Sequence, residues 1–229
     1  MSLFMLIKPD QVLQYAGVRS KHILDSPPSD LVLSAEQTAL EMEQTLQPKT
    51  VWKVFELQHE ESGIVLKGTN LVLPGRLASL MLSDCTHVIV MAATLGMMFE
   101  HKLEEKSARN MAEALMWDAC GSACVESVLD ELEQTISQKL TDRQHLTDRF
   151  SCGYGDLPLD LQNGVSDLLN LPSLGIFLTD SGMMIPSKSV TAFMGISPHV
   201  QKSRIRGCSV CAVKDSCPYR SQGTSCQAE

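Results

Sequence analysis

Hydrophobic residues recur at helical spacing in several parts of the chain. The clearest case covers residues 31–46, where the apolar positions are Leu33, Ala39, Leu40, Met42 and Leu46. A shorter helix is predicted over residues 8–17, ending at a glycine, and further helices over about 76–83, 97–107 and 159–169. The longest predicted helix runs from residue 108 to about 140. Its apolar stripe is Met111, Leu115, Ala119, Ala123, Leu129, Leu132, Ile136 and Leu140.

Other segments are typical of strands. Residues 51–57 are rich in β-branched and aromatic side chains, and a turn near Gly63 leads to a partner strand from Ile64. A compact apolar run predicts a buried strand at residues 87–92, and shorter strands are predicted at 175–178 and 190–196. Helices and strands do not alternate regularly, as they would in a doubly wound parallel sheet. The pattern predicts an α+β fold with a twisted, largely antiparallel sheet packed with helices.

Composition narrows the classes of partner. Of the 229 residues, 44% are hydrophobic and 20% charged, which is ordinary for a soluble globular protein. The formal net charge of -8 disfavours a nucleic-acid partner, because such a surface repels phosphate backbones. No apolar run reaches the roughly 20 residues needed to cross a bilayer. The first eight residues lack the charged start of a signal peptide, so we expect a cytoplasmic protein without a membrane partner.

A first candidate site is the glycine-rich segment 149–158. Glycines on either side of Tyr154 allow the backbone to approach a ligand closely. The planar guanidinium of Arg149 suits a carboxylate, and the Tyr154 ring can stack on a flat ligand. The alternative is a plain turn with a surface arginine.

A second candidate is the polar segment 178–190, which contains Asp180, Ser181 and Lys188. Hydroxyls, a carboxylate and an ammonium group lie close together there, between two predicted strands. The alternative is a hairpin with ordinary polar turn residues.

These two segments carry a resemblance to a known family. The run RFSCGYGDLPLDLQ and the later run LGIFLTDSGMMIPSKSVTAFMGIS resemble the activation (reactivation) domain of cobalamin-dependent methionine synthase, especially its free-standing form. The stretches VIVMAATLG and ALMWDA are also similar to that form. The resemblance extends from about residue 12 to 197, which suggests a domain over residues 1–200 and a separate tail over 201–229.

The resemblance implies a function. In this family the domain binds S-adenosylmethionine and caps a cobalamin domain whose cobalt has been oxidised. A flavodoxin-like or ferredoxin-like donor supplies an electron, and the methyl group restores methylcobalamin. Arg149 would then bind the ligand's carboxylate, and backbone groups of Cys152, Gly153 and Tyr154 would hold the adenosine part. Asp180 and Ser181 are the remaining candidates for contact with the ligand.

The cobalamin would be supplied by a partner, either a corrinoid-binding protein or a methionine synthase subunit. The sequence has no Asp-x-His-x-x-Gly motif for a corrinoid ligand, and no Gly-x-Ser-x-Gly or His-Glu-x-x-His motif. A sulfonium is electrophilic by itself, so methyl transfer needs positioning more than a catalytic base. Two alternatives stay open: an assembly partner that does not bind the methyl donor, and a stand-alone small-molecule methyltransferase.

The tail contains four of the eight cysteines: Cys208, Cys211, Cys217 and Cys226. Four thiolates within so short a segment favour a zinc ion or an iron–sulfur cluster in a reducing compartment. A redox disulfide and free thiols are the alternatives.

Overall fold

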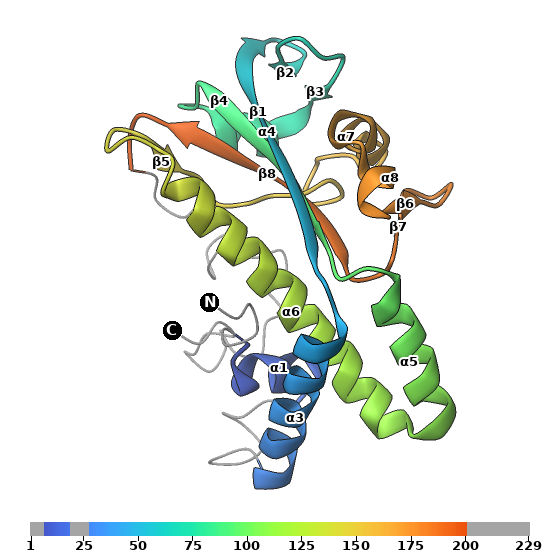
Figure 1. The fold of residues 1–229 in the computed structure, drawn as a ribbon. Coiled ribbons are helices and arrows are strands. Elements are labelled where there is room, and N and C mark those ends of the chain that lie inside the picture. Colours follow the sequence, from blue (N-terminus) through green and yellow to red (C-terminus); the bar gives the residue numbers. More distant parts are fainter. Residues whose placement is uncertain (1–6, 19–27, 201–229) are drawn as a thin grey trace, which may run out of the picture. The chain divides into compact units, whose positions relative to one another are not determined.

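A computed structural model describes residues 7–18 and 28–200 (Figure 1). Its helices are α1 (Pro9–Tyr15), α3 (Ser29–Thr45), α4 (Gly75–Leu82), α5 (Met97–Arg109), α6 (Met111–Ser137), α7 (Leu161–Leu169) and α8 (Leu171–Leu174). Its strands are β1 (Lys49–Glu60), β2 (Gly63–Leu66), β3 (Val72–Leu73), β4 (His87–Thr94), β5 (His145–Leu146), β6 (Phe177–Leu178), β7 (Met184–Ile185) and β8 (Ser189–Ser197).

The strands form one larger sheet and one small hairpin. The larger sheet has six strands in the order β3-β2-β1-β4-β8-β5, and β6 pairs with β7 separately. The outer pairs are antiparallel, with Leu57 opposite Leu66 between β1 and β2, and His145 opposite Ser197 between β5 and β8. The predicted α+β fold with a largely antiparallel sheet is confirmed.

The chain divides into two compact units, and the divisions fall within β1, β4, α7 and β8 and between α6 and β5. One unit comprises Met1–Trp52, Met91–Gln138 and Ser166–Thr191; the other comprises Lys53–Val90, Lys139–Val165 and Ala192–Glu229. We call them the helical unit and the sheet-edge unit and describe each by itself.

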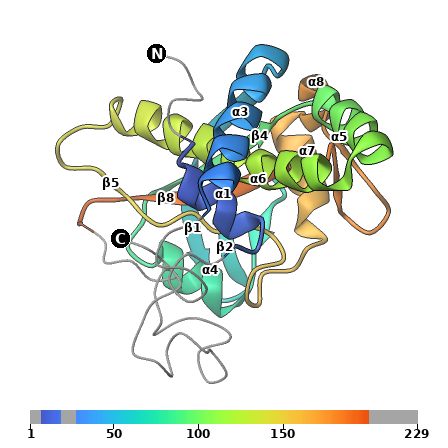
Figure 2. The ribbon, with the colours of Figure 1, turned by 90° about the horizontal axis from the view of Figure 1, so that it is seen from below.

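Helix α6 is the centre of the helical unit, and α1 and α3 pack against it (Figure 2). Asn110 separates α6 from α5, because its side chain accepts a hydrogen bond from the Ala112 amide and caps the new helix. The two helices then pack through Trp117, whose ring stacks on Phe99 with centroids 5.9 Å apart. The indole N–H donates to the Phe99 carbonyl, so this large side chain is fully buried with its polar atom satisfied.

Some of the apolar positions predicted on two helices are not covered by neighbouring elements. Met42 and Leu46 are buried, but Leu33 and Leu40 of α3 are 53% and 57% exposed. Met111 and Leu115 at the start of α6 are 70% and 56% exposed, whereas the later members from Ala119 to Ile136 are buried. Periodicity identifies a helix and its apolar positions, but neighbouring elements determine which of those positions are covered.

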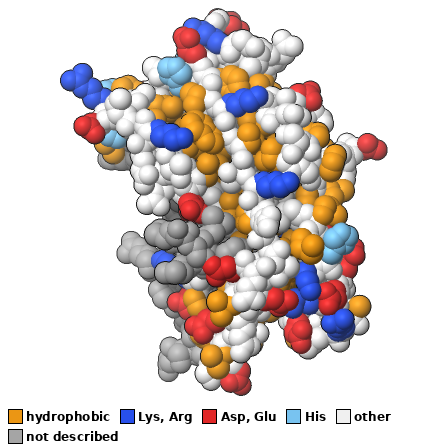
Figure 3. Space-filling model, viewed as in Figure 1, with side chains coloured by type: hydrophobic (Ala, Val, Ile, Leu, Met, Phe, Trp, Pro, Cys, Tyr) orange, Lys and Arg blue, Asp and Glu red, His pale blue; other side chains and the backbone are white. Residues whose placement is uncertain are grey.

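The sheet-edge unit is built on the predicted β1–β2 hairpin, with α4 packed against β2. At Gly195, the backbone of β8 lies too close to neighbouring side chains to carry a side chain of its own. A Cβ there would lie 2.4 Å from the Cys85 sulfur and 2.8 Å from a Leu82 methyl carbon. Hydrophobic side chains remain visible on the face drawn in Figure 3, consistent with Val54 of β1 being 43% exposed.

Within the described residues, no helix is long and apolar enough to cross a membrane.

Candidate functional site

The glycine-rich loop is joined directly to the sheet. Phe150 pairs with Phe193 of β8 through two backbone hydrogen bonds of 3.0 and 2.8 Å. Their rings are 5.5 Å apart in a tilted arrangement, and both side chains are buried. Arg149 therefore leaves a fixed point of the backbone rather than a free loop, which suits a residue that must hold a ligand group in one position.

The loop that follows is closed by its own backbone. The Tyr154 amide donates to the Ser151 carbonyl, the Gly153 amide to the Leu157 carbonyl, and the Leu157 amide to the Tyr154 carbonyl. Gly153 and Gly155 have φ angles of +81° and +60°, which glycine adopts without strain. The amide hydrogens of Gly153 and Tyr154 are thus donated within the loop, so these two amides are not available to a ligand.

Asp156 attaches the loop to helix α4. Its two carboxylate oxygens accept from the amides of Arg76 at 2.6 Å and Leu77 at 2.9 Å. The residue at the helix N-cap position is Pro74, which makes no side-chain cap, so Asp156 takes that role from 80 residues away. These amides hold the pKa of Asp156 below its ordinary value. The sequence analysis missed this role, although an Asp in a turn and a proline-glycine helix start are both visible.

The side chains of the loop differ in accessibility. Arg149 is partly buried, including its Nη1 atom, whereas Tyr154 is 45% exposed. The thiol of Cys152 has its pKa raised to about 11, chiefly by burial. Cys152 is therefore a neutral thiol near pH 7 rather than a nucleophile.

The second segment forms the β6–β7 hairpin, as its alternative interpretation predicted. The Thr179 hydroxyl lies 2.9 Å from the Ser181 hydroxyl and accepts from the Met183 amide at 3.1 Å. Asp180 and Ser181 are both exposed in the turn. They belong to the helical unit, whereas Arg149, Cys152, Gly153 and Tyr154 belong to the sheet-edge unit.

Lys188, just after this hairpin, is bound to α6. Its Nζ atom lies 2.9 Å from both the Asp118 carboxylate and the Ser122 hydroxyl. The same ammonium is 5.7 Å from the centroid of the Phe99 ring. Gly121 of α6 allows the Phe99 ring to approach the helix closely, since a Cβ there would lie 2.3 Å from that ring. Lys188 therefore fixes the base of the hairpin rather than serving as a free ligand-binding cation.

No group of three or more potential metal-ligating side chains occurs among the residues that the structure describes. The four predicted metal ligands Cys208, Cys211, Cys217 and Cys226 lie outside the described residues, as does the whole of the predicted tail.

Comparison with known proteins gives likeness in structure without a match in sequence. No family model matches the chain, and no curated protein matches it. Among solved structures, the chain is similar to a crystal structure of the MetH reactivation domain bound to AdoHcy, with a TM-score of 0.67 and 17% sequence identity. The match covers 97% of this chain and 83% of that one. At this identity the likeness concerns architecture, and it shows that the chain has the fold of the MetH reactivation domain.

Proposed function

We propose that this protein binds S-adenosylmethionine and supports the reductive methylation of a cobalamin carried by a separate corrinoid protein or methionine synthase subunit. The observation that carries the proposal is the fold shared with a reactivation domain whose crystal structure contains AdoHcy, the demethylated form of the same ligand. The sequence resemblance over residues 149–162 and 174–197 supports the same assignment.

The residues of the glycine-rich loop fit this ligand. Arg149 offers a guanidinium that can bind the amino-acid carboxylate through two parallel hydrogen bonds. The half-exposed Tyr154 ring is available to the adenine face. Because Gly153 and Tyr154 donate their amides within the loop, we assign polar contact with the adenosine to carbonyl oxygens of Cys152 and Gly153. Asp180 and Ser181, which belong to the helical unit, remain candidates for contact with the ligand.

The chain's part in the reaction is to bind and orient. The sulfonium would supply the methyl group and leave as AdoHcy, and the partner's cobalamin, once reduced by one electron from a flavodoxin-like or ferredoxin-like donor, would accept the methyl group. Holding the carboxylate at Arg149 and the ring at Tyr154 fixes the ligand at both ends and so directs its methyl group. No residue of the loop needs to act as a nucleophile, which agrees with the raised pKa of the Cys152 thiol.

Calorimetric titration with S-adenosylmethionine and, separately, with AdoHcy tests the binding step. Saturable one-to-one binding of both ligands is expected, with no turnover when only small thiols or amines are added. The partner step is tested by adding a corrinoid protein in its cob(II)alamin form with a reductant and following methylcobalamin by absorbance. Absence of binding would favour the assembly-partner alternative, and turnover with a small acceptor would favour a stand-alone methyltransferase.

For the tail we propose one bound metal ion or cluster, held by Cys208, Cys211, Cys217 and Cys226. Thiolate ligands suit zinc or iron–sulfur chemistry, and so short a segment would gain its folding energy from the metal. Elemental analysis of anaerobically purified protein is expected to give about one equivalent of zinc or a cluster's content of iron. A variant with all four residues changed to serine is the control, and equally low metal in both proteins would contradict the proposal.

A further inference from the structure

Helix α3 has a second apolar side that does not face the core. Ala35, Met42 and Leu46 are buried, whereas Leu40 is 57% exposed. Residues two apart in a helix point about 200° from each other, so Leu40 and Met42 lie on opposite sides. An apolar side chain of this size on the outer face indicates either an ordinary exposed leucine or a surface that another segment covers.

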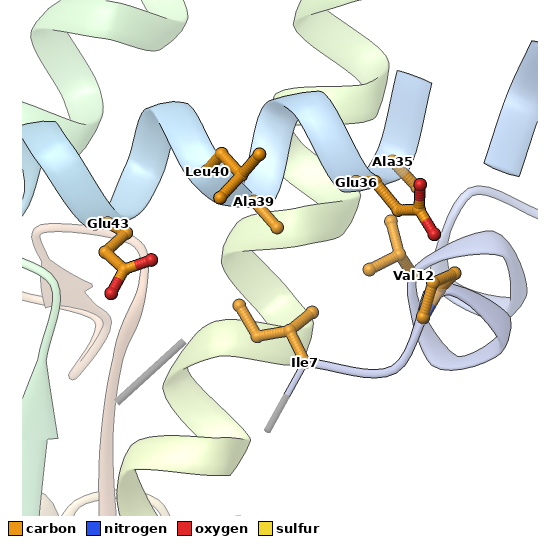
Figure 4. Close-up of a pocket in the computed structure, with 8 residues that line it drawn as sticks. Ile7, Val12, Ala35, Glu36, Ala39, Leu40 and Glu43 are labelled. Carbon is orange, nitrogen blue, oxygen red and sulfur yellow. The ribbon is translucent and has the colours of Figure 1, made fainter. Parts of the chain in front are cut away.

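One side of α3, which includes the buried Ala35 as well as the exposed Leu40, lines a groove, and α1 and Ile7, two residues before it, form the opposite wall (Figure 4). The groove measures about 370 Å³ and is lined mostly by apolar side chains, including Ile7, Val12, Ala39 and Leu40. Glu36 and Glu43 lie one at each end of the α3 wall. On a helix these two residues are separated by about 10 Å, so the groove could accept two or three residues of extended chain.

The segment directly before Ile7 has the composition that such a groove requires. Residues 3–6 are Leu-Phe-Met-Leu, with no charged side chain. They are joined to Ile7, which is itself part of the groove wall, so they need no long connection to reach it. Four extended residues span about 13 Å, which is enough to cover the distance from Glu36 to Glu43. Because the segment is covalently attached beside the groove, its effective concentration there is higher than that of a free partner.

We infer that residues 3–6 of the chain lie in the α1–α3 groove and cover Leu40. The apolar groove then holds part of the protein's own chain and is not the binding site for the methyl donor. This inference does not depend on the proposed function, because it involves only the helical unit and residues outside the two candidate segments.

A double-mutant cycle tests the contact in the full-length protein. One change is L40S in the groove; the other replaces Leu3, Phe4, Met5 and Leu6 together by serine. If the segment covers Leu40, L40S is expected to lower the Tm by about 3–6 °C in the unsubstituted chain and by about 1 °C or less once the segment is polar. Additive effects of the two changes would overturn the inference.

Leu33 provides the matched control. It lies on the same helix and is 53% exposed, but it does not line the groove. L33S is expected to change the Tm equally in both backgrounds. A second readout avoids any dependence on stability: methyl-selective NMR should show nuclear Overhauser contacts from the Phe4 ring or the Met5 methyl to Leu40 and Ala39. Contacts to Leu33 instead, or none to the groove residues, would also overturn it.

Discussion

The carboxylate of Asp156 accepts a hydrogen bond of 2.6 Å from the backbone amide of Arg76, across 80 residues of sequence. The same carboxylate accepts from the Leu77 amide, so one side chain of the glycine-rich loop caps the start of helix α4. A loop proposed to bind a ligand is thereby held to a helix end, and its conformation depends on that helix.

Replacing Asp156 is expected to loosen both elements. Asp156→Ala should lower the Tm by roughly 2–4 °C, because two amides at the start of α4 lose their acceptor. Asp156→Asn should have a smaller effect, since its amide can accept only through one oxygen. Asp142→Ala, which removes an exposed carboxylate of the same unit, is the control. An equal Tm for the Asp156→Ala and Asp142→Ala proteins would contradict the role of the cap.

The contribution of Asp156 should also depend on pH. Its pKa is lowered in the folded protein, so its stabilisation is fully present above the ordinary aspartate value of about 3.9 and is lost as the pH falls through the lower folded value. The Tm difference between the unsubstituted protein and Asp156→Ala should therefore be constant from about pH 5 to 7 and shrink below about pH 4. A difference that grows on acidification would contradict this assignment.

Gly121 is expected to tolerate no side chain. Gly121→Ala would normally favour a helix, but its Cβ would lie 2.3 Å from the Phe99 ring and 3.3 Å from the Lys188 side chain. We expect a net loss of about 1–3 kcal/mol in the free energy of unfolding, measured by denaturant titration. Phe99→Leu should partly rescue the substitution by removing the clash. Additive losses in the double variant would show that the ring is not the obstacle.

Arg149 is expected to dominate ligand affinity. Arg149→Ala should weaken S-adenosylmethionine binding by about 2–4 kcal/mol in calorimetry, the scale of a lost charge-assisted bidentate contact. Arg149→Lys should also bind poorly, because a point charge cannot reproduce the planar fork. Arg143→Ala, an exposed arginine of the same unit, is the matched control. Unchanged affinity in Arg149→Ala would show that Arg149 does not bind the ligand. The assignment of the fold does not depend on this result.

The thiols should separate by reactivity. Burial raises the pKa of Cys120 and of Cys124 to about 12, and Cys152 has a pKa of about 11. Cys85 is also buried. Since the thiolate is the reacting form, a thiol reagent at pH 8 under native conditions should modify at most the four tail cysteines rapidly, and all eight only after unfolding. A fast phase that persists in the variant lacking the tail cysteines would contradict the burial of Cys85, Cys120 and Cys124 or the raised pKa of the half-buried Cys152.

The parts of this fold that sequence could predict are those governed by local chemistry. The β1–β2 turn needed Gly63, whose φ of +141° and closeness to the Leu73 carbonyl exclude a side chain. Strand β4 was visible as an uninterrupted apolar run. By contrast, β5 and β7 have two residues each, which is too short for any periodicity. The cap from Asp156 joins distant segments, so the sequence shows its two parts, an Asp in a turn and a proline-glycine helix start, but not that they meet.

For the candidate site, the sequence predicted which residues take part but not the contacts that they make. Glycines around Tyr154 and the adjacent Arg149 marked the loop correctly as irregular. The internal hydrogen bonds that occupy the Gly153 and Tyr154 amides follow from the closed shape of the loop, which composition does not specify. Lys188 was grouped with the polar turn, yet its partners Asp118 and Ser122 come from a helix more than 60 residues earlier.

Strands β4 and β8 are covered on both sides: every residue of β4 after His87 is buried, and in β8 only Val190 is partly exposed. Their backbone amides are therefore shielded from solvent by side chains above and below as well as by neighbouring strands. Opening these two strands separates the centre of the core, whereas the outer part of β1 can fray at little cost. Amide exchange in β4 and β8 is thus expected to report global unfolding, and exchange in the outer part of β1 to report local opening.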